Sequence, residues 1–291
     1  MLRLVVVSGL SGSGKSVALN MLEDLDYYCV DNIPAGLLPG FIAYTVRTSE
    51  PAYRLTAVGV DARNRPEDLA AVPRLVAELR RSGIGCELLF LRADNESLLK
   101  RFSETRRRHP LSRDGIGLQE ALEQEQRLLE PVASAADLTI DTSRLSVHEL
   151  REMVRARVAE RPATGPSLLF ESFAYRHGVP DDADFVFDAR AMPNPYWDPA
   201  LRSHTGRDPA VVQFLDGQEE VARFLADLTG FLERWLPALV RSNRSYLTIA
   251  VGCTGGQHRS VYLAEKLAAH FNGRFGQTLI RHRDLASRSH E

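Results

Sequence analysis

The sequence contains almost no lysine. Of its 36 basic residues only three are lysines, Lys15, Lys100 and Lys266, and all the others are arginines. The two side chains are not interchangeable, because a guanidinium is a planar fork and an ammonium is a compact point charge. When a motif in such a sequence contains a lysine, arginine therefore cannot take over the function of that side chain. Lys15 stands in such a motif.

Cysteine and long apolar runs are also scarce. Cys29, Cys86 and Cys253 lie far apart, without CxxC or CxxH spacing. This excludes a disulfide framework and a cysteine zinc site, and it is typical of a reducing compartment. The apolar residues 1–7 are too few for a signal peptide, and no later run approaches membrane-spanning length. We therefore expect a cytoplasmic protein without a membrane partner.

The composition is otherwise that of an ordinary globular protein. The 291 residues are 44% hydrophobic and 25% charged, with a formal net charge of -2. A chain of this length predicts two domains. The slightly negative net charge excludes a globally basic nucleic-acid binder, although a local basic patch stays open.

Short β-branched stretches alternate with amphipathic ones through the first part of the chain. Strands are predicted over residues 2–7, 27–31, 55–61, 87–92 and 138–141, and helices over 16–25, 67–81, 96–108, 118–135 and 147–159. Strands that alternate with helices imply right-handed βαβ crossovers. We therefore predict an α/β domain over residues 1–161, with a mostly parallel sheet covered by helices on both faces.

A second domain is predicted over residues 167–291. Two prolines and a glycine in residues 161–166 mark the linker that precedes it. Its strands are predicted over residues 168–173, 185–187, 246–251 and 278–281, and its helices over 211–215, 219–235 and 261–271. The second domain is therefore again α/β.

A glycine-rich loop directly follows the first strand. It fits GxxxxGK[ST] in full and opens a helix, which is the context that a P-loop requires. Loop amides and the helix N-terminus bind phosphate oxygens, and the lysine reaches the β- and γ-phosphates. The alternative is an accidental glycine turn. The predicted ATP-binding residues of this kinase-like P-loop NTPase domain are Gly9, Leu10, Ser11, Gly12, Ser13, Gly14, Lys15 and Ser16.

The same motif predicts magnesium on the nucleotide. The Ser16 hydroxyl is the expected metal ligand, together with a carboxylate at the end of a neighbouring strand. Asp31 ends the second predicted strand and Asp61 the third, and the sequence does not choose between them. Each is alternatively a turn or cap aspartate. We take Lys15, Ser16 and Asp31 as the catalytic residues, and ATP or GTP with Mg²⁺ as the cofactor.

Three consecutive arginines end the helix predicted over residues 96–108. Arg106, Arg107 and Arg108 precede a histidine and a proline. One interpretation is a lid that brings guanidinium groups to the transferring phosphate. The other is a solvated basic terminus that complements the helix dipole, because three consecutive residues cannot share one helix face. Both stay open.

A second glycine loop, residues 252–260 (GCTGGQHRS), stands between a predicted strand and a predicted helix. It forms a second anion cradle by the same physics as the first. The spacing from Cys253 to Arg259 also matches cysteine-dependent phosphatases, with Asp198 as the general acid. Gly252, however, replaces the histidine that usually precedes the cysteine. Phosphate binding, phosphatase chemistry and a purely structural turn are the three alternatives.

Both loops belong to a longer series of ordered motifs. The series comprises GLSGSGKS, YYCVDN at 27–32, DARN at 61–64, ETRRRHP at 104–110, DTS at 141–143, DAR at 188–190, PNP at 193–195 and GCTGGQHRSV at 252–261. Over nearly the whole chain it resembles the RapZ-like P-loop nucleotide-binding proteins of bacteria, the RNase adapter family.

The resemblance implies particular ligands for each domain. It implies binding and slow hydrolysis of ATP and GTP by the first domain, with a GTP contact at Asp61, Ala62, Arg63 and Asn64. For the second domain it implies a glucosamine-6-phosphate site at Asp188, Arg190, Asn194, Thr254, Gly255, Gly256, His258 and Arg259. Here Ala62 stands where the family usually has valine, a small departure that leaves the polar residues in place.

A small regulatory RNA and a protein partner are implied as well, and we expect a homo-oligomer. Gln257 stands where some members carry lysine, and the tail is poorer in lysine than theirs, which weakens the RNA expectation. We therefore expect a nucleotide-dependent regulator whose second domain senses an amino-sugar phosphate. The alternatives are a small-molecule P-loop kinase and a phosphatase that works through Cys253.

Overall fold

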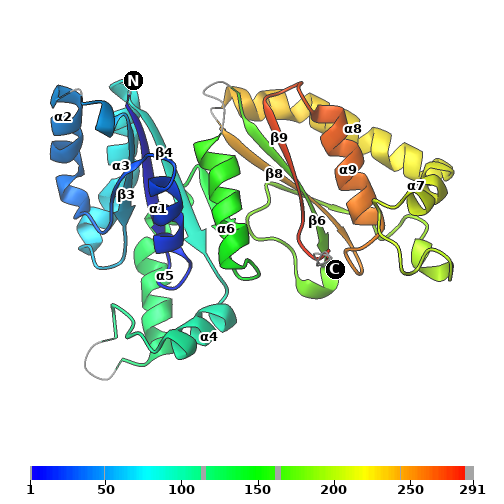
Figure 1. Cartoon of the computed structure of the whole chain (residues 1–291), viewed down its shortest axis with the longest axis horizontal. Helices are drawn as coiled ribbons and strands as arrows, with labels where there is room; N and C mark the ends of the chain where they lie inside the picture. Colours follow the sequence, from blue (N-terminus) through cyan, green and yellow to red (C-terminus); the bar gives the residue numbers. More distant parts are fainter. Residues whose placement is uncertain (1, 49, 113–115, 161–164, 243, 286–291) are drawn as a thin grey trace. The chain divides into compact units, whose positions relative to one another are not determined.

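The chain folds as two α/β units. The computed structural model describes residues 2–48, 50–112, 116–160, 165–242 and 244–285. The two compact units are Met1–Glu160 and Arg161–Glu291, both drawn in Figure 1. Most of the predicted linker, residues 161–164, lies outside the described residues. Each unit has its own parallel sheet and its own hydrophobic core.

The first unit is built on a five-stranded parallel sheet with the order β2-β3-β1-β4-β5. Its strands are β1 (Arg3–Gly9), β2 (Tyr28–Val30), β3 (Leu55–Val60), β4 (Gly85–Arg92) and β5 (Leu138–Asp141). Every residue of β1 after Arg3 is buried, so both faces of the sheet are covered, as predicted. The strand order reverses around β1, and open α/β sheets bind their ligands at the carboxyl ends of the strands at such a point.

Six helices belong to the described part of the first unit. They are α1 (Lys15–Glu23), α2 (Leu38–Thr48), α3 (Pro66–Arg81), α4 (Asn95–Thr105), α5 (Leu118–Ser134) and α6 (Val147–Val154), with 3-10 turns at Ala35–Leu37 and Pro51–Tyr53 and a π-helical turn at Arg155–Ala159. Helix α3 packs against α5, and α1 packs against α6. Leu4 and Val6 of β1 belong to the same core cluster as Leu69 of α3 and Leu122 of α5.

Two helices differ from the prediction. Helix α2 is not among the predicted helices, and its first turn contains Pro39 and Gly40. Proline is tolerated in the first turn of a helix, however, and Leu38 and Ile42 supply the buried face of α2. The helix predicted over residues 96–108 ends as α4 at Thr105, because Arg106 adopts a left-handed conformation with φ 51°.

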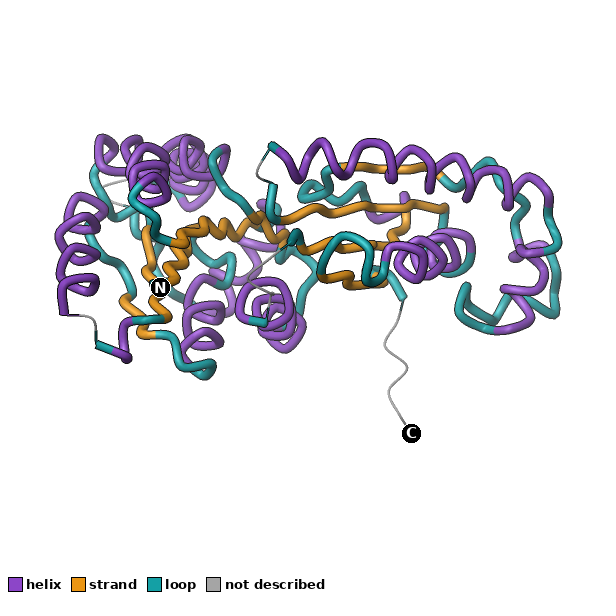
Figure 2. Tube along the Cα trace, turned by 90° about the horizontal axis from the view of Figure 1, so that it is seen from above, coloured by secondary structure: helices purple, strands orange, loops and turns teal. Residues whose placement is uncertain are grey.

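The second unit is a four-stranded parallel sheet with the order β7-β8-β6-β9. Its strands are β6 (Ser167–Ala174), β7 (Phe185–Asp188), β8 (Tyr246–Cys253) and β9 (Gln277–His282), and its helices are α7 (Pro209–Asp216), α8 (Glu219–Arg241) and α9 (Arg259–Phe271), with 3-10 turns at Tyr175–His177 and Pro195–Trp197. Figure 2 shows the long helix α8 running beside these strands.

The core of the second unit forms where α8 and α9 pack on the sheet. Leu232 and Leu236 of α8 share one cluster with Leu263 of α9 and Ile249 of β8. Helix α8 continues past its predicted end at residue 235 to Arg241, with Pro237 inside it. Within the described residues, no helix combines the length and apolarity that crossing a membrane would require.

Candidate functional site

The P-loop joins β1 to α1 at the carboxyl edge of the first sheet. Gly14 precedes α1 with φ 101°, a left-handed conformation that an L side chain rarely adopts. A Cβ atom there would also lie 2.5 Å from Cδ2 of Leu150. The turn is closed by the Ser13 amide, which donates to the Leu10 carbonyl at 2.9 Å. The loop therefore has the shape of a phosphate cradle at a helix N-terminus.

A pocket of about 700 Å³ opens over this loop. Such a volume is ordinary for small-molecule and cofactor sites. The pocket brings together residues from several segments of the first unit that the sequence analysis selected separately. These are Leu10 to Ser16, Asp31, Asp61, Arg63, Arg107 and Arg108, and the lining also includes Arg101 and Thr142.

Lys15 faces a carboxylate within this pocket. Its Nζ lies 2.6 Å from Oδ2 of Asp61, which is only 3% exposed. Arg63 binds the same carboxylate from its Nη2 at 2.6 Å. Burial alone would raise the pKa of Asp61, but the hydrogen bond from Arg63 and the charge of Lys15 outweigh it and hold the pKa at about 2. Asp61 is therefore an anion that orients the P-loop lysine.

Replacing Asp61 by Asn tests this ion pair through its pH dependence. The folded pKa of about 2 lies below the ordinary value of 3.8, so the pair stabilises the fold above about pH 4 and loses this effect as the pH falls toward 2. We expect Asp61→Asn to lower the free energy of unfolding by about 2 kcal/mol at pH 7 and by roughly half as much at pH 3. Denaturant unfolding at pH 7, 5 and 3 measures the difference.

The exposed Glu67, changed to Gln, is the matched control for that series. Surface substitutions of this kind change stability by less than about 0.5 kcal/mol. A difference between wild type and Asp61→Asn that stays constant from pH 7 to pH 3 would contradict the ion-pair account.

Asp31 differs from Asp61 in its surroundings. It follows β2, is exposed, and lines the same pocket as Ser16. Among the described residues its carboxylate forms no hydrogen bond or ion pair. The two aspartates that the sequence left as alternatives therefore have different environments: Asp61 is occupied by Lys15 and Arg63, and Asp31 is available. No group of three or more His, Cys, Asp or Glu side chains in the described part of the chain could hold a metal ion by itself.

The three consecutive arginines separate in the structure. Arg106 caps α4, whereas Arg107 and Arg108 line the P-loop pocket. All three are exposed. The helix ends before Arg107 and Arg108, and both line the pocket over the loop. The lid stays a prediction.

Two further residues hold the P-loop and were not predicted as site residues from the sequence. Arg101 of α4 donates from Nη1 to the Gly12 carbonyl and to the Thr142 hydroxyl, each at 3.0 Å. Thr142 in turn donates to the Ser13 carbonyl at 2.9 Å. Thr142 follows β5 at the carboxyl edge of the sheet, so its place in the chain was a usable signal. Arg101 offered none, because its role depends on how α4 approaches the loop.

The resemblance implied a GTP contact at residues 61–64, and these residues have two different environments. Asp61 and Arg63 line the P-loop pocket. Asn64 instead serves the backbone, since its Oδ1 accepts the Ala35 amide at 2.6 Å and its Nδ2 donates to the Asp61 carbonyl at 3.1 Å. Ala62 is buried. Asn64 therefore fixes the turn, and the GTP contact stays a prediction.

The second glycine loop joins β8 to α9 and has a buried base. Cys253 is only 3% exposed, and its Sγ lies 3.1 Å from the Ser260 hydroxyl. A Cβ atom on Gly252 would lie 2.4 Å from Cζ of Phe173, which is fully buried and cannot retreat. The histidine of a phosphatase loop therefore does not fit at this position. The carboxylate of Asp198 accepts the Ala200 amide at 2.9 Å, as a turn aspartate does.

Two side chains predicted as ligand donors hold the second loop from inside. Arg259 is 5% exposed and donates from Nη1 to the carbonyls of Arg190 at 2.8 Å and Met192 at 2.9 Å. Its Nε is buried and has no partner among the described residues. His258 is also buried, and its Nε2 lies 3.3 Å from the Leu201 carbonyl. Burial lowers the pKa of His258, which favours the neutral ring.

The remaining predicted ligands gather around this loop. Asp188 and Arg190 form an ion pair at 2.6 Å, and the Arg190 guanidinium lies 3.9 Å from the ring centroid of Tyr175. Asn194 accepts the Tyr196 amide at 3.4 Å. Thr254 is exposed at the loop tip, and a Cβ atom on Gly255 would meet no described atom within 4 Å. The open side of the loop therefore presents Thr254 and Gly255.

An aspartate and a histidine beside this loop were missed in the sequence. Asp284 accepts the Ala174 amide at 2.7 Å and lies 2.6 Å from Nδ1 of His177. A Cβ atom on Gly256 would lie 3.0 Å from Cβ of Asp284. Asp284 lies two residues after the end of β9, so its position after a strand was the available signal.

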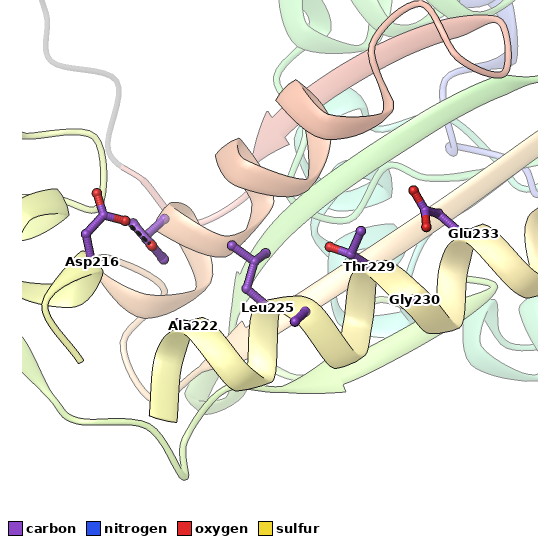
Figure 3. A pocket seen from close by; sticks show the side chains of 8 residues that line it. Asp216, Ala222, Leu225, Thr229, Gly230 and Glu233 are labelled. Atoms are coloured by element: carbon purple, nitrogen blue, oxygen red, sulfur yellow. Dashed lines mark hydrogen bonds between the residues drawn. The ribbon is translucent and has the colours of Figure 1, made fainter. Parts of the chain in front are cut away.

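A separate hollow of about 420 Å³ lies along α8 (Figure 3). Ala222, Leu225 and Thr229 of α8 line it, with Asp216 and Glu233 at its margin. Its charged groups are already engaged: Asp216 accepts the Tyr262 hydroxyl at 2.5 Å, and Glu233 pairs with His270 at 2.7 Å. We therefore assign it no ligand.

Two family models together cover nearly the whole chain. The RapZ-like N-terminal domain matches residues 2–161, and the RapZ C-terminal domain matches residues 166–286. The chain belongs to the RapZ-like family. The resemblance expected from the ordered motifs is thus confirmed, and the two glycine loops fall in different domains of the family.

Relatives of similar length match this RapZ-like chain throughout. A nucleotide-binding protein of Thioalkalivibrio sulfidiphilus is 54% identical over 286 residues, which cover 98% of this chain and 100% of the relative. One from Methylococcus capsulatus is 51% identical over 290 residues, covering 100% of this chain and 98% of the relative. A shikimate kinase structure from Bacteroides thetaiotaomicron aligns with 53% of this chain and 97% of its own, at a TM-score of 0.36 and 11% identity, which is too low to bear on function.

Proposed function

We propose that the first domain binds ATP or GTP with Mg²⁺ at the P-loop and hydrolyses it slowly. One observation carries this proposal: the loop, its lysine, two aspartates and four arginines line one pocket at the reversal point of the sheet. Loop amides and Lys15 would hold the phosphates, and Arg107 and Arg108 would neutralise charge that develops on the terminal one. The relatives named as nucleotide-binding proteins support the same conclusion.

Ser16 and Asp31 are the residues that would hold the magnesium ion. Both are exposed in the P-loop pocket, and a hydroxyl and a carboxylate are oxygen ligands that Mg²⁺ accepts. When bound, the magnesium ion would neutralise part of the negative charge of the phosphates. Asp61 takes a different part, since it orients Lys15 through their ion pair.

The same pocket is compatible with a small-molecule kinase, so hydrolysis and transfer must be measured separately. Incubation of the full chain with γ-labelled ATP and a panel of phosphosugars gives both quantities. The regulator proposal expects slow release of inorganic phosphate and no labelled sugar. Label that appears in one sugar would establish the kinase alternative instead.

For the second domain we propose a site for an amino-sugar phosphate, with glucosamine-6-phosphate as the ligand. The buried, partly unpartnered Arg259 supports an anion at the loop, because a buried cation without a carboxylate partner is costly. Gly255, Gly256 and Thr254 would hold the phosphate by their amides and hydroxyl. Asp188 would take the amine, in exchange for its present partner Arg190.

The RNA and protein partners enter this proposal through the family resemblance alone. Two arginines near the C-terminus form ion pairs within the second unit. Arg281 pairs with the buried Glu171 at 2.9 Å, and Arg283 pairs with Asp284 at 3.3 Å. Residues 286–291 lie outside the described residues. These two arginines therefore do not support the proposal of an RNA contact.

Cys253→Ser separates binding from phosphatase chemistry at the second loop. Because Sγ is buried against Ser260, we expect the serine variant to bind glucosamine-6-phosphate within a few-fold of wild type. Calorimetry measures the affinity, and an aryl phosphate assay on both proteins measures hydrolysis. The sensor proposal fails if wild type hydrolyses the aryl phosphate and the variant does not, while both bind glucosamine-6-phosphate. The second domain would then be a phosphatase that works through Cys253.

A further inference from the structure

A fully buried carboxylate lies behind the P-loop. Glu125 of α5 has no exposed surface. Its Oε2 accepts the Ser11 amide at 2.8 Å, and its Oε1 accepts the Ser11 hydroxyl at 2.7 Å. Burying a carboxylate is costly unless its oxygens are satisfied, and here two of the donors come from one residue of the loop. Glu125 therefore fixes the position of Ser11.

The same carboxylate also holds His109. This side chain is buried, and its Nε2 lies 3.1 Å from Oε2 of Glu125. Its Nδ1 accepts the Leu111 amide at 3.1 Å. Because Nδ1 acts as an acceptor, the proton of the neutral ring resides on Nε2, which donates to Glu125. The ring is thus held in one tautomer and one orientation.

His109 directly follows the two arginines that line the P-loop pocket. Phe102 of α4 packs on its ring, with the centroids 5.3 Å apart. The segment that carries Arg107 and Arg108 therefore ends on a residue anchored to Glu125. One buried carboxylate connects the P-loop on one side with the segment that carries Arg107 and Arg108 on the other.

We infer that Glu125 is a positioning residue that sets Arg107 and Arg108 for the terminal phosphate of a nucleoside triphosphate. The inference rests on the proposed nucleotide binding. Ser11 precedes the part of the loop that runs into α1, where the helix N-terminus favours the inner phosphates. Arginines recognise phosphate by charge-assisted hydrogen bonds, so their placement affects a ligand that has the terminal phosphate more than one that lacks it. The network therefore contributes to the preference for triphosphate over diphosphate.

A purely structural Glu125–His109 pair would behave differently. Its loss would lower thermal stability and weaken ATP and ADP binding alike. A positioning role instead changes the ratio of the two affinities, and it disappears when the arginines are absent. A double-mutant cycle distinguishes these outcomes, because interacting residues give non-additive effects.

The experiment measures the affinities of the full chain for Mg·ATP and Mg·ADP by calorimetry. The proteins are wild type, Glu125→Gln, the double variant Arg107→Ala/Arg108→Ala, and the combination of all three changes. Glutamine removes the negative charge and leaves a single acceptor oxygen, so it weakens the charge-assisted hydrogen bonds that hold Ser11 and His109. Glu123→Gln is the matched control, since Glu123 is exposed on the same helix.

We expect Glu125→Gln to lower the ATP-to-ADP affinity ratio about tenfold, a typical size for coupling between groups in one network, while ADP affinity stays within a few-fold. The same change on the arginine-less background should leave the ratio unaltered. Equal weakening of both nucleotides, or full additivity, would overturn the inference. No binding of either nucleotide by folded wild type would instead refute the nucleotide proposal on which the inference rests.

A second pair of variants keeps the test decisive where Glu125→Gln does not fold. His109→Gln retains an N–H donor in place of Nε2 and should keep the wild-type ratio. His109→Leu removes that donor and should lower the ratio as Glu125→Gln does. Equal ratios in the two histidine variants would count against the positioning role.

Discussion

Lys15→Ala should weaken the binding of Mg·ATP by roughly tenfold to a hundredfold for each charge-assisted contact that is lost. The lysine sits where the loop enters α1, and its ammonium is the one cation that the motif places against the β- and γ-phosphates. Asp61 keeps Arg63 as its partner in the variant, so the pocket retains a paired carboxylate. Calorimetry with magnesium present measures the change.

Two further variants complete the test of Lys15. Lys15→Arg should not restore affinity, because a planar fork does not fit where a point charge is needed. Lys100→Ala is the control, since Lys100 is exposed on α4 and does not line the pocket. Unchanged affinity in Lys15→Ala would refute the P-loop assignment.

The second large effect is expected for Arg259→Ala in the other domain. The change should abolish binding of glucosamine-6-phosphate, glucose-6-phosphate and inorganic phosphate together, since it removes the buried cation behind the loop. It also leaves the carbonyls of Arg190 and Met192 without their donor, at a cost of about 1–3 kcal/mol for each buried group left unpaired. Calorimetry gives the affinities, and circular dichroism shows whether the domain is still folded.

Asp188→Ala and Arg207→Ala are the comparison variants for Arg259. Asp188→Ala should remove only the preference for the amino sugar, because its carboxylate is assigned to the amine. Arg207→Ala, an exposed arginine outside the loop, should leave all three affinities unchanged. Full phosphate binding by a folded Arg259→Ala protein would contradict the assignment of the phosphate to Arg259.

Local signals in the sequence were sufficient for the two loops. Each is a strand, a glycine-containing loop and a helix in direct succession, and both appear at the predicted places between β1 and α1 and between β8 and α9. Helix α2 was not predicted. Its apolar face is short, and Pro39 and Gly40 weaken the local helix signal. The orders of both sheets could not be predicted, because pairing such as that of β1 with β4 joins segments far apart in the chain.

Contacts between distant segments account for the site residues that were missed. Glu125 and Arg101 reach the P-loop only because α5 and α4 pack beside it, and nothing in their own neighbourhoods signals this. The reverse holds for His258 and Asn64, which look like ligand donors in the sequence. Their hydrogen bonds go to the main chain, so they shape the sites from within.

Direct titration of the full wild-type chain with Mg·ATP and with Mg·GTP tests the central claim. Binding to a P-loop predicts saturable heat that depends on magnesium and that is lost in Lys15→Ala. A folded wild-type protein that gives no saturable binding with either nucleotide would contradict the account.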